Sequence, residues 1–171
     1  MLGPRRLVII ALAALAAAAT TAGAEVLPQP QREPLLTVSG AIAETNRPGE
    51  AVFDRAMLEA LPWTTFETAT IRTEGRRRFT GVPLGALPEA VGAEGRELQA
   101  AAINDYVVTI PASDAVAGGP IVAYEMDGSE MSVRDKGPLW IVYSYDRSSD
   151  YQTEMIYSRS IWQRIRIGVV E

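Results

Sequence analysis

Histidine and cysteine are both absent from this 171-residue chain, and their absence limits the chemistry that it can perform. Without an imidazole or a thiolate, the chain cannot build a zinc site of the usual Cys/His type, nor a Ser-His-Asp or Cys-His nucleophile system. It cannot form disulfides, and no side chain titrates near neutral pH unless its pKa is strongly perturbed. Catalysis would therefore depend on carboxylates, arginines, Lys136, tyrosines, hydroxyl groups or a bound cofactor.

One segment has the alternating oxygen spacing of a calcium-binding loop. Asp146, Ser148 and Asp150 stand at every second position. However, the sixth position of this loop is Tyr151, where a tight calcium loop needs glycine, and the twelfth is Tyr157, where it needs glutamate. A solvated polar loop is the favoured interpretation.

Two clusters of charged residues are the other local candidates. Arg76, Arg77 and Arg78 lie at the tip of a presumed hairpin, where a solvated tip is favoured over a grip on an anion. Four acids surround a second presumed hairpin, namely Glu125, Asp127, Glu130 and Asp135. Strand alternation places some of them on opposite faces, which favours a solvated sheet edge over a paired-carboxylate site. We expect the tryptophans in the core, at positions Trp63, Trp140 and Trp162.

The N-terminus is typical of a cleavable secretion signal over residues 1–24. Arg5 and Arg6 precede an apolar, alanine-rich run, and the small residues Ala22-Gly23-Ala24 form the expected cleavage site. Cleavage leaves 147 residues with 14 basic and 21 acidic side chains, a net charge of −7. The sequence therefore predicts a periplasmic or secreted domain without a stable membrane span, and the charge argues against nucleic-acid binding.

The remaining chain predicts a linker over residues 25–34 and one strand-dominated α+β domain over residues 35–171. Asp54 is a good helix N-cap, with Phe53 and Leu58 at the two positions of a hydrophobic staple. A second helix is expected over Pro83–Val91 and a helical turn over Pro111–Val116. Alternation and β-branched residues predict strands at Leu35–Ile42, Thr64–Thr73, Arg77–Thr80, Leu98–Ile103, Tyr106–Ile110, Ile121–Met126, Ser129–Val133 and Leu139–Tyr145. The last candidate elements are Met155–Ser160 and Trp162–Val170.

Several motifs along this domain together resemble the molybdopterin-binding domain of the sulfite-oxidase family, and its short exported bacterial members most of all. They are Phe79-Thr-Gly-Val-Pro-Leu84, Asn104-Asp-Tyr-Val-Val-Thr-Ile-Pro111, Met126-Asp-Gly-Ser-Glu-Met131, Gly137-Pro-Leu139 and Ser160-Ile-Trp162. The match runs from about Leu35 to Val170, and the order and spacing of the motifs carry it. The resemblance implies curled mixed sheets and a molybdenum–pterin cofactor whose metal is held by one cysteine thiolate.

The chain departs from this family where the chemistry would lie. The resemblance places the family's cysteine within Thr68–Arg78, near Thr70, where Thr70 and Thr73 offer hydroxyl oxygens. An alcohol ionises far less readily than a thiol, so it does not simply replace the thiolate. The arginine that follows Gly-x-Pro-Leu in family members is Trp140 here, and the lysine before the last tryptophan is Ile161.

Three hypotheses follow from these departures. The first is a non-catalytic domain that carries no cofactor and binds a small ligand, such as an anion, or a periplasmic protein partner in a redox or signalling system. The second is an oxidoreductase that retains molybdopterin without a cysteine ligand. The third is an unrelated secreted binding domain. For a ligand pocket the sequence predicts a lining of Asn104, Tyr106, Arg134, Lys136 and Arg159, with no metal ligand; for each of these a turn or a surface salt bridge is the alternative.

Overall fold

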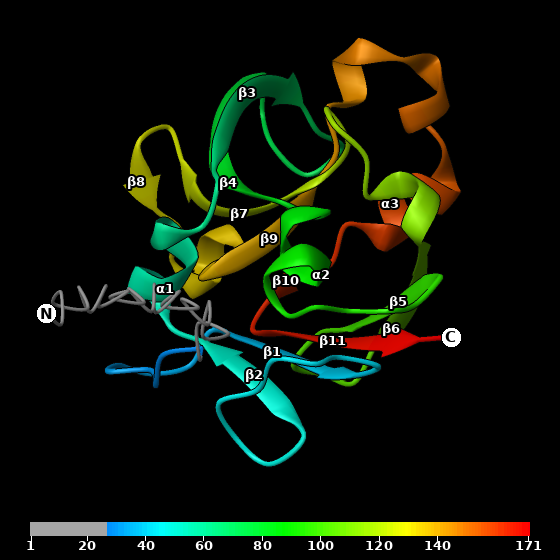
Figure 1. The fold of residues 1–171 in the computed structure, drawn as a ribbon. Coiled ribbons are helices and arrows are strands. Elements are labelled where there is room, and N and C mark those ends of the chain that lie inside the picture. Colours follow the sequence, from blue (N-terminus) through cyan, green and yellow to red (C-terminus); the bar gives the residue numbers. More distant parts are fainter. Residues whose placement is uncertain (1–26) are drawn as a thin grey trace, which may run out of the picture.

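The computed structural model describes residues 27–171, so the predicted signal peptide at residues 1–24 lies outside the described residues. These residues form two sheets with short helices around them (Figure 1). The first sheet has the strand order β2-β1-β11-β5-β6, and the second has the order β10-β9-β7-β4-β3, with β8 paired to β7. In Figure 1 the first sheet occupies the lower half of the domain and the second lies above it. The strand-rich α+β class predicted from the sequence is confirmed.

The first sheet is mixed, because β1 pairs with β11 in parallel while its other pairings are antiparallel. Its strands are β1 (Leu36–Gly40), β2 (Glu50–Phe53), β5 (Glu97–Ala101), β6 (Val107–Pro111) and β11 (Ile165–Val170). The second sheet is antiparallel throughout. Its strands are β3 (Thr64–Ala69), β4 (Arg76–Pro83), β7 (Ile121–Met126), β8 (Ser129–Glu130), β9 (Leu139–Val142) and β10 (Trp162–Gln163).

The helices are short and lie at the ends of strands. They are α1 (Arg55–Ala60), α2 (Ala86–Ala90) and α3 (Glu154–Arg159), with single 3-10 turns η1 (Ala112–Asp114), η2 (Val133–Asp135), η3 (Tyr145–Arg147) and η4 (Ser149–Tyr151). Asp54 caps α1 as predicted, since its Oδ1 accepts a hydrogen bond from Met57 N at 3.0 Å. Within residues 27–171 no helix is both long and apolar enough to cross a bilayer.

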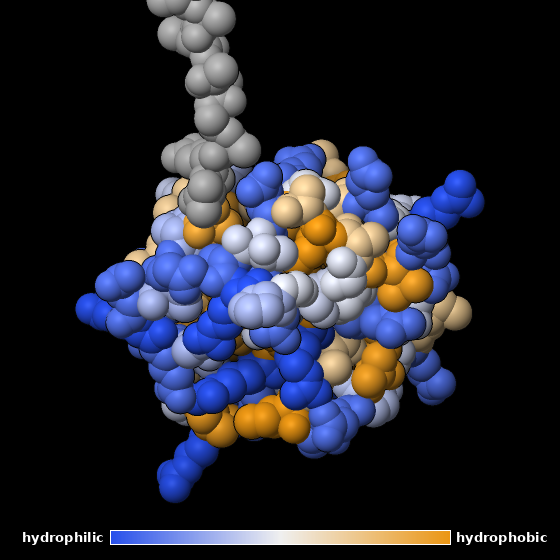
Figure 2. All heavy atoms as spheres, turned by 60° about the horizontal axis from the view of Figure 1, so that its bottom comes forward, coloured by the Kyte–Doolittle hydropathy of each residue, from blue (hydrophilic) through white to orange (hydrophobic). Residues whose placement is uncertain are grey.

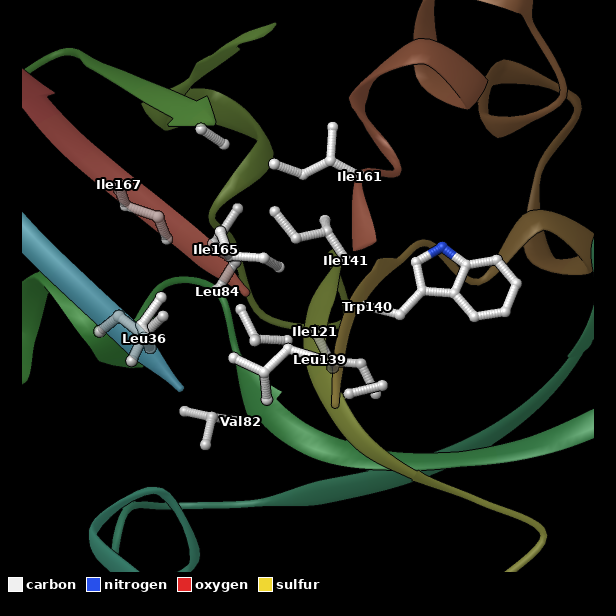
Figure 3. Packing of buried hydrophobic residues seen from close by; sticks show 14 of the residues in the cluster. Leu36, Val82, Leu84, Ile121, Leu139, Trp140, Ile141, Ile161, Ile165 and Ile167 are labelled. Atoms are coloured by element: carbon white, nitrogen blue, oxygen red, sulfur yellow. The ribbon is translucent and has the colours of Figure 1, made fainter. Parts of the chain in front are cut away.

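Apolar side chains from both sheets meet in one core (Figure 3). Leu36, Ile165 and Ile167 come from the first sheet and face Val82, Ile121, Leu139 and Ile141 of the second. Each of these seven side chains is at most 2% exposed. On the face shown in Figure 2, by contrast, hydrophilic residues predominate and apolar residues form separate small patches. The alternation that predicted strands therefore also separates core from surface.

The predictions made for Pro83 and for Trp63 are wrong. Pro83 does not begin a helix: it is the last residue of β4, where it pairs with Ile121, and α2 begins only at Ala86. Trp63 is not a core residue, because it lies in the turn between α1 and β3 and is 62% exposed. Trp140 is buried as predicted, and Trp162 is partly buried against the core.

The described part of the predicted linker, residues 27–34, contains no helix or strand but is tied to the domain. Backbone N–H groups of Gln31 and Arg32 donate to Asp54 Oδ2 at 2.7 and 3.0 Å. Asn46, which is buried, donates through Nδ2 to Pro28 O at 2.7 Å. These bonds hold the segment against the start of α1 and β2.

Candidate functional site

The loop between β3 and β4 occupies the position where the family resemblance places the metal ligand. Its two hydroxyl groups, on Thr70 and Thr73, hydrogen-bond each other at 3.0 Å. Thr70 Oγ1 also accepts from the backbone N of Arg72 at 3.0 Å. The hydroxyl groups of this loop are therefore bonded within the loop itself. The side chain of Arg72 extends from it toward Trp162 of the neighbouring strand β10.

Cations and indole rings meet beside this loop. Trp140 of β9 and Trp162 of β10 are register partners, and their rings pack edge-to-face with centroids 6.5 Å apart. The guanidinium carbon of Arg72 lies 5.2 Å from the ring centroid of Trp162. Lys136 Nζ lies 5.6 Å from the Trp140 centroid and 5.7 Å from that of Trp162. Cation–π contacts contribute about 0.5–1 kcal/mol each at exposed sites. They orient the two side chains, and both side chains keep their positive charge.

Two cavities adjoin this cluster and share Arg72. The first, which we call the aromatic cavity, measures about 250 Å³, and its lining includes Asn104, Tyr106, Tyr157, Trp162 and Gln163. Apart from Arg72, the side chains that line it are uncharged, and most carry a hydrogen-bonding group. The cavity thus presents rings and neutral polar groups to a ligand.

The second cavity, which we call the cationic cavity, measures about 200 Å³. Four cations line it, namely Arg72, Arg77, Arg134 and Lys136, together with the acids Glu74 and Asp135 and with Trp140. Ser132 Oγ donates to Asp135 Oδ2 at 2.6 Å, so this carboxylate is engaged within its own turn.

The five residues predicted to line a pocket lie in three different parts of the structure. Asn104 and Tyr106, at the turn between β5 and β6, line the aromatic cavity. Arg134 and Lys136, in and after η2, line the cationic cavity. Arg159 is the last residue of α3 and is absent from the lining of both cavities.

Arg159 instead forms a partly buried ion pair with a distant residue. Its Nη1 lies 2.8 Å from Asp114 Oδ2, and the two side chains are only 16% and 18% exposed. The Tyr143 hydroxyl donates to the same oxygen at 2.9 Å. Burial and the carboxylate of Asp114 raise the pKa of Tyr143 above its usual range, so this phenol remains a donor. The arrangement anchors the end of α3, from which Ser160, Ile161 and Trp162 continue into the wall of the aromatic cavity.

Sequence reasoning did not find Arg72, which borders both cavities. The predicted strand over Thr64–Thr73 placed it among alternating residues, whereas β3 ends at Ala69 and leaves Arg72 in a loop. The pair Glu74-Gly75 indicates a turn after Thr73, and Gly75 does adopt a positive φ of 64°. No local signal shows that the strand ends as early as Ala69, so the exposed loop position of Arg72 was hidden.

Most residues of the two charged clusters noted in the sequence form ion pairs with other side chains. Arg76 pairs with Asp146 and Arg78 with Glu67, at 3.3 and 3.1 Å. Arg77 pairs with Asp127 at 3.0 Å. Glu125 pairs with Arg55 at 2.8 Å, and Glu130 lies 3.8 Å from the same guanidinium. Because most of these pairs are exposed, each contributes little to stability.

The donors around the loop do not fit a molybdenum–thiolate centre. The hydroxyls of Thr70 and Thr73 are neutral and bond each other, and Thr68 Oγ1 accepts from Asp146 N at 3.1 Å. Among residues 27–171 no group of three or more Asp, Glu, His or Cys side chains is placed to hold a metal ion. A metal at this point would lack the thiolate that the family resemblance implies.

No protein-family model matches the chain, and no curated protein matches it. Among solved structures the chain is similar to the sulfane dehydrogenase SoxCD from Paracoccus pantotrophus, with a TM-score of 0.59 and 20% sequence identity. The match covers 79% of this chain and 37% of that chain, so this chain spans little more than a third of its neighbour's length. At this identity the likeness concerns the fold alone.

Proposed function

We propose that this protein is an exported, non-catalytic domain of the sulfite-oxidase fold that binds a small ligand in the aromatic cavity and its surroundings. The sequence motifs and the structural likeness to a dehydrogenase support the fold. The proposal that the domain is non-catalytic rests on the structure of the loop at Thr70–Gly75. It occupies the expected position of the metal ligand with two hydroxyls bonded to each other and with an arginine over an indole ring.

The aromatic cavity supports binding as the retained activity. Its rings provide stacking surfaces, and the neutral groups of Asn104, Ser160 and Gln163 provide donors and acceptors. A site with a few placed polar groups among aromatic side chains is typical of small-molecule recognition. Gln163 has a positive φ of 76°, a strained conformation for a residue with a side chain. Such strain is concentrated at functional sites, and Gln163 lines the aromatic cavity.

Native mass spectrometry of the mature protein, purified from the compartment to which it is exported, tests this proposal. We expect a bound small molecule whose mass contains no molybdenum. Tyr106→Ser should lose the bound molecule while staying folded, because Tyr106 is 52% exposed. Trp63→Ser is the matched control, since Trp63 is exposed and lines neither cavity.

Three results would contradict the proposal. A molybdenum-containing adduct would restore the oxidoreductase hypothesis. Equal loss of the ligand in Trp63→Ser and Tyr106→Ser would remove the aromatic cavity as its site. A protein without any bound small molecule, recovered instead in a complex with a protein partner, would replace ligand binding by partner binding.

A further inference from the structure

The strand β3 is the longest of the four strands that lie at sheet edges. It has six residues, whereas β2 has four, β6 has five and β10 has two. Natural proteins usually protect an exposed edge with lysine, proline, a bulge or a covering element. β3 contains neither lysine nor proline, whereas β6, the next longest, ends in Pro111. At the outer edge of the second sheet, β3 is therefore the strand most open to pairing with another strand (Figure 1).

The hydrogen bonds of the neighbouring strand show which backbone groups of β3 face outward. In an antiparallel pair, the N–H and C=O of one residue point to the same side, and successive residues alternate. The register partner of Glu67 is Arg78 in β4. Arg78 N donates to Asp127 Oδ1 at 3.0 Å and Arg78 O accepts from Asp127 N at 2.7 Å, so neither group bonds β3. Glu67, and Thr65 two residues before it, thus direct their backbone groups away from β4.

Most of these outward groups lack a partner within the chain. At the end of the strand, Ala69 N donates to Asp146 Oδ2 at 2.9 Å, which agrees with this alternation. Glu67 O accepts a hydrogen bond at 3.2 Å from Nη2 of Arg76, whose side chain is exposed. Among residues 27–171, no group outside the sheet bonds the N–H of Glu67 or the N–H and C=O of Thr65. Both residues are exposed, so a further strand can reach them.

We propose that β3 pairs in antiparallel fashion with β3 of a second copy of this chain, about a two-fold axis at Phe66. In this register Thr65 of each copy lies opposite Glu67 of the other. The outward backbone groups then meet as two symmetric pairs, and each pair exchanges two N–H···O bonds. The two second sheets become one continuous sheet across the axis.

The side chains along β3 suit pairing of this strand with itself. Thr65 Oγ1 and Thr80 Oγ1 share a hydrogen bond at 2.8 Å, and with Thr80 as its donor the Thr65 hydroxyl can donate to the opposite Glu67 carboxylate. No like charges face each other, because Glu67 is the one charged residue of β3. The register also places Trp63, which is 62% exposed, opposite the small Ala69 of the second copy. These matches of β3 with itself favour a second copy over a foreign strand.

Sedimentation equilibrium of the mature protein over a wide range of concentration, combined with amide hydrogen exchange followed by NMR, tests the proposal. We expect a reversible dimer that is weak, because a single strand pairing buries less than the about 1,200–2,000 Å² of a stable interface. Exchange of the Thr65 and Glu67 amides should slow as the concentration rises. The Phe66 amide faces β4 and should exchange slowly at every concentration, so it is the internal reference.

Charge variants at Thr65 test the register. Thr65→Glu places carboxylates directly opposite each other in both symmetric pairs and should raise the dissociation constant about fivefold or more. Thr65→Lys places an ammonium group opposite Glu67 and should not weaken the dimer, although both variants lose the same bond to Thr80. Thr109→Glu is the matched control, because Thr109 is an exposed threonine of another edge strand, β6. Circular dichroism checks that each variant is folded.

A monomer at all concentrations, with fast exchange at Thr65 and Glu67, would overturn the proposal. A dimer weakened equally by Thr65→Glu and Thr65→Lys, or equally by Thr65→Glu and Thr109→Glu, would overturn it too, because neither pattern depends on the register of β3. Protection of these amides only in a complex with another protein would assign the edge to a foreign strand instead. Ligand and metal content are separate measurements, so the failure of this proposal leaves the proposed function untouched.

Discussion

Replacement of Arg159 by methionine removes the cation from a partly buried ion pair and tests whether this residue anchors the site rather than lining it. Methionine keeps much of the aliphatic stem, so packing changes little. The carboxylate of Asp114 then retains one described partner, the hydroxyl of Tyr143 at 2.9 Å. The loss is therefore mainly electrostatic.

The expected cost follows from the burial of the pair. Exposed ion pairs contribute up to about 1 kcal/mol, and breaking a fully buried pair costs about 3–5 kcal/mol. With side chains 16% and 18% exposed, this pair lies between the two limits. We expect Arg159→Met to lower the free energy of unfolding by about 2–3 kcal/mol. For a domain of this size that lowers Tm by roughly 4–12 °C.

Urea unfolding of four proteins measures the interaction itself. The wild type, Arg159→Met, Asp114→Asn and the double variant form a thermodynamic cycle. We expect a coupling of about 1–3 kcal/mol, because the double variant leaves no unpaired carboxylate behind. Additive effects, or a loss below about 0.5 kcal/mol in Arg159→Met, would show that the two side chains do not support each other.

Three further predictions concern the framework around the site. Asp54→Asn should destabilise the domain by about 1–2 kcal/mol near pH 7, measured by urea unfolding, because an amide NH2 in place of Oδ2 cannot accept the hydrogen bonds from the backbone of residues 31 and 32. Burial of Asp54 opposes its ionisation, but hydrogen bonds from backbone N–H groups outweigh burial and lower its pKa. The stability that its charge contributes is therefore fully present above the pKa of the unfolded state, about 3.9. This contribution is lost as the pH falls through the lower pKa of the folded state. The difference between Asp54→Asn and wild type should therefore shrink near pH 2, and a constant difference would contradict this assignment. Gly137→Ala should cost about 3 kcal/mol or prevent folding, because a Cβ there would overlap the carbonyl oxygen of Met131. Gly168→Ala is the control, since its Cβ would meet Gln99 only at ordinary contact distance, 3.8 Å, and equal stabilities would refute the argument.

Local patterns predicted most strands because alternation reports which face is buried. The hairpin at Asp127-Gly128 is an example: both residues adopt positive φ, and the chain turns between β7 and β8 as expected. The helix predicted over Pro83–Val91 is present as α2, but its start was placed too early, for a physical reason. Proline fits a first helical turn, but it also fits the end of a strand, and only the pairing with Ile121 decides between them.

Four of the five residues predicted for a ligand pocket line one of the two cavities, and they belong to short turns. Asn104 and Tyr106 follow a turn signal, and Lys136 precedes the Gly-Pro-Leu motif, so sequence reasoning could single them out. The partner of Arg159 could not be predicted, since Asp114 lies 45 residues away and no local pattern joins them. The exposure of Trp63 was equally hidden, because residue type alone says that tryptophan is usually buried.

Molybdenum analysis tests the central claim most directly. The full-length chain would be produced in cells that make the cofactor, beside a molybdenum enzyme as a positive control, and the purified protein would be analysed by mass spectrometry for metal. A folded protein with no molybdenum above the buffer blank is the predicted result. Stoichiometric molybdenum, together with turnover of an oxygen-atom-transfer substrate, would contradict the account.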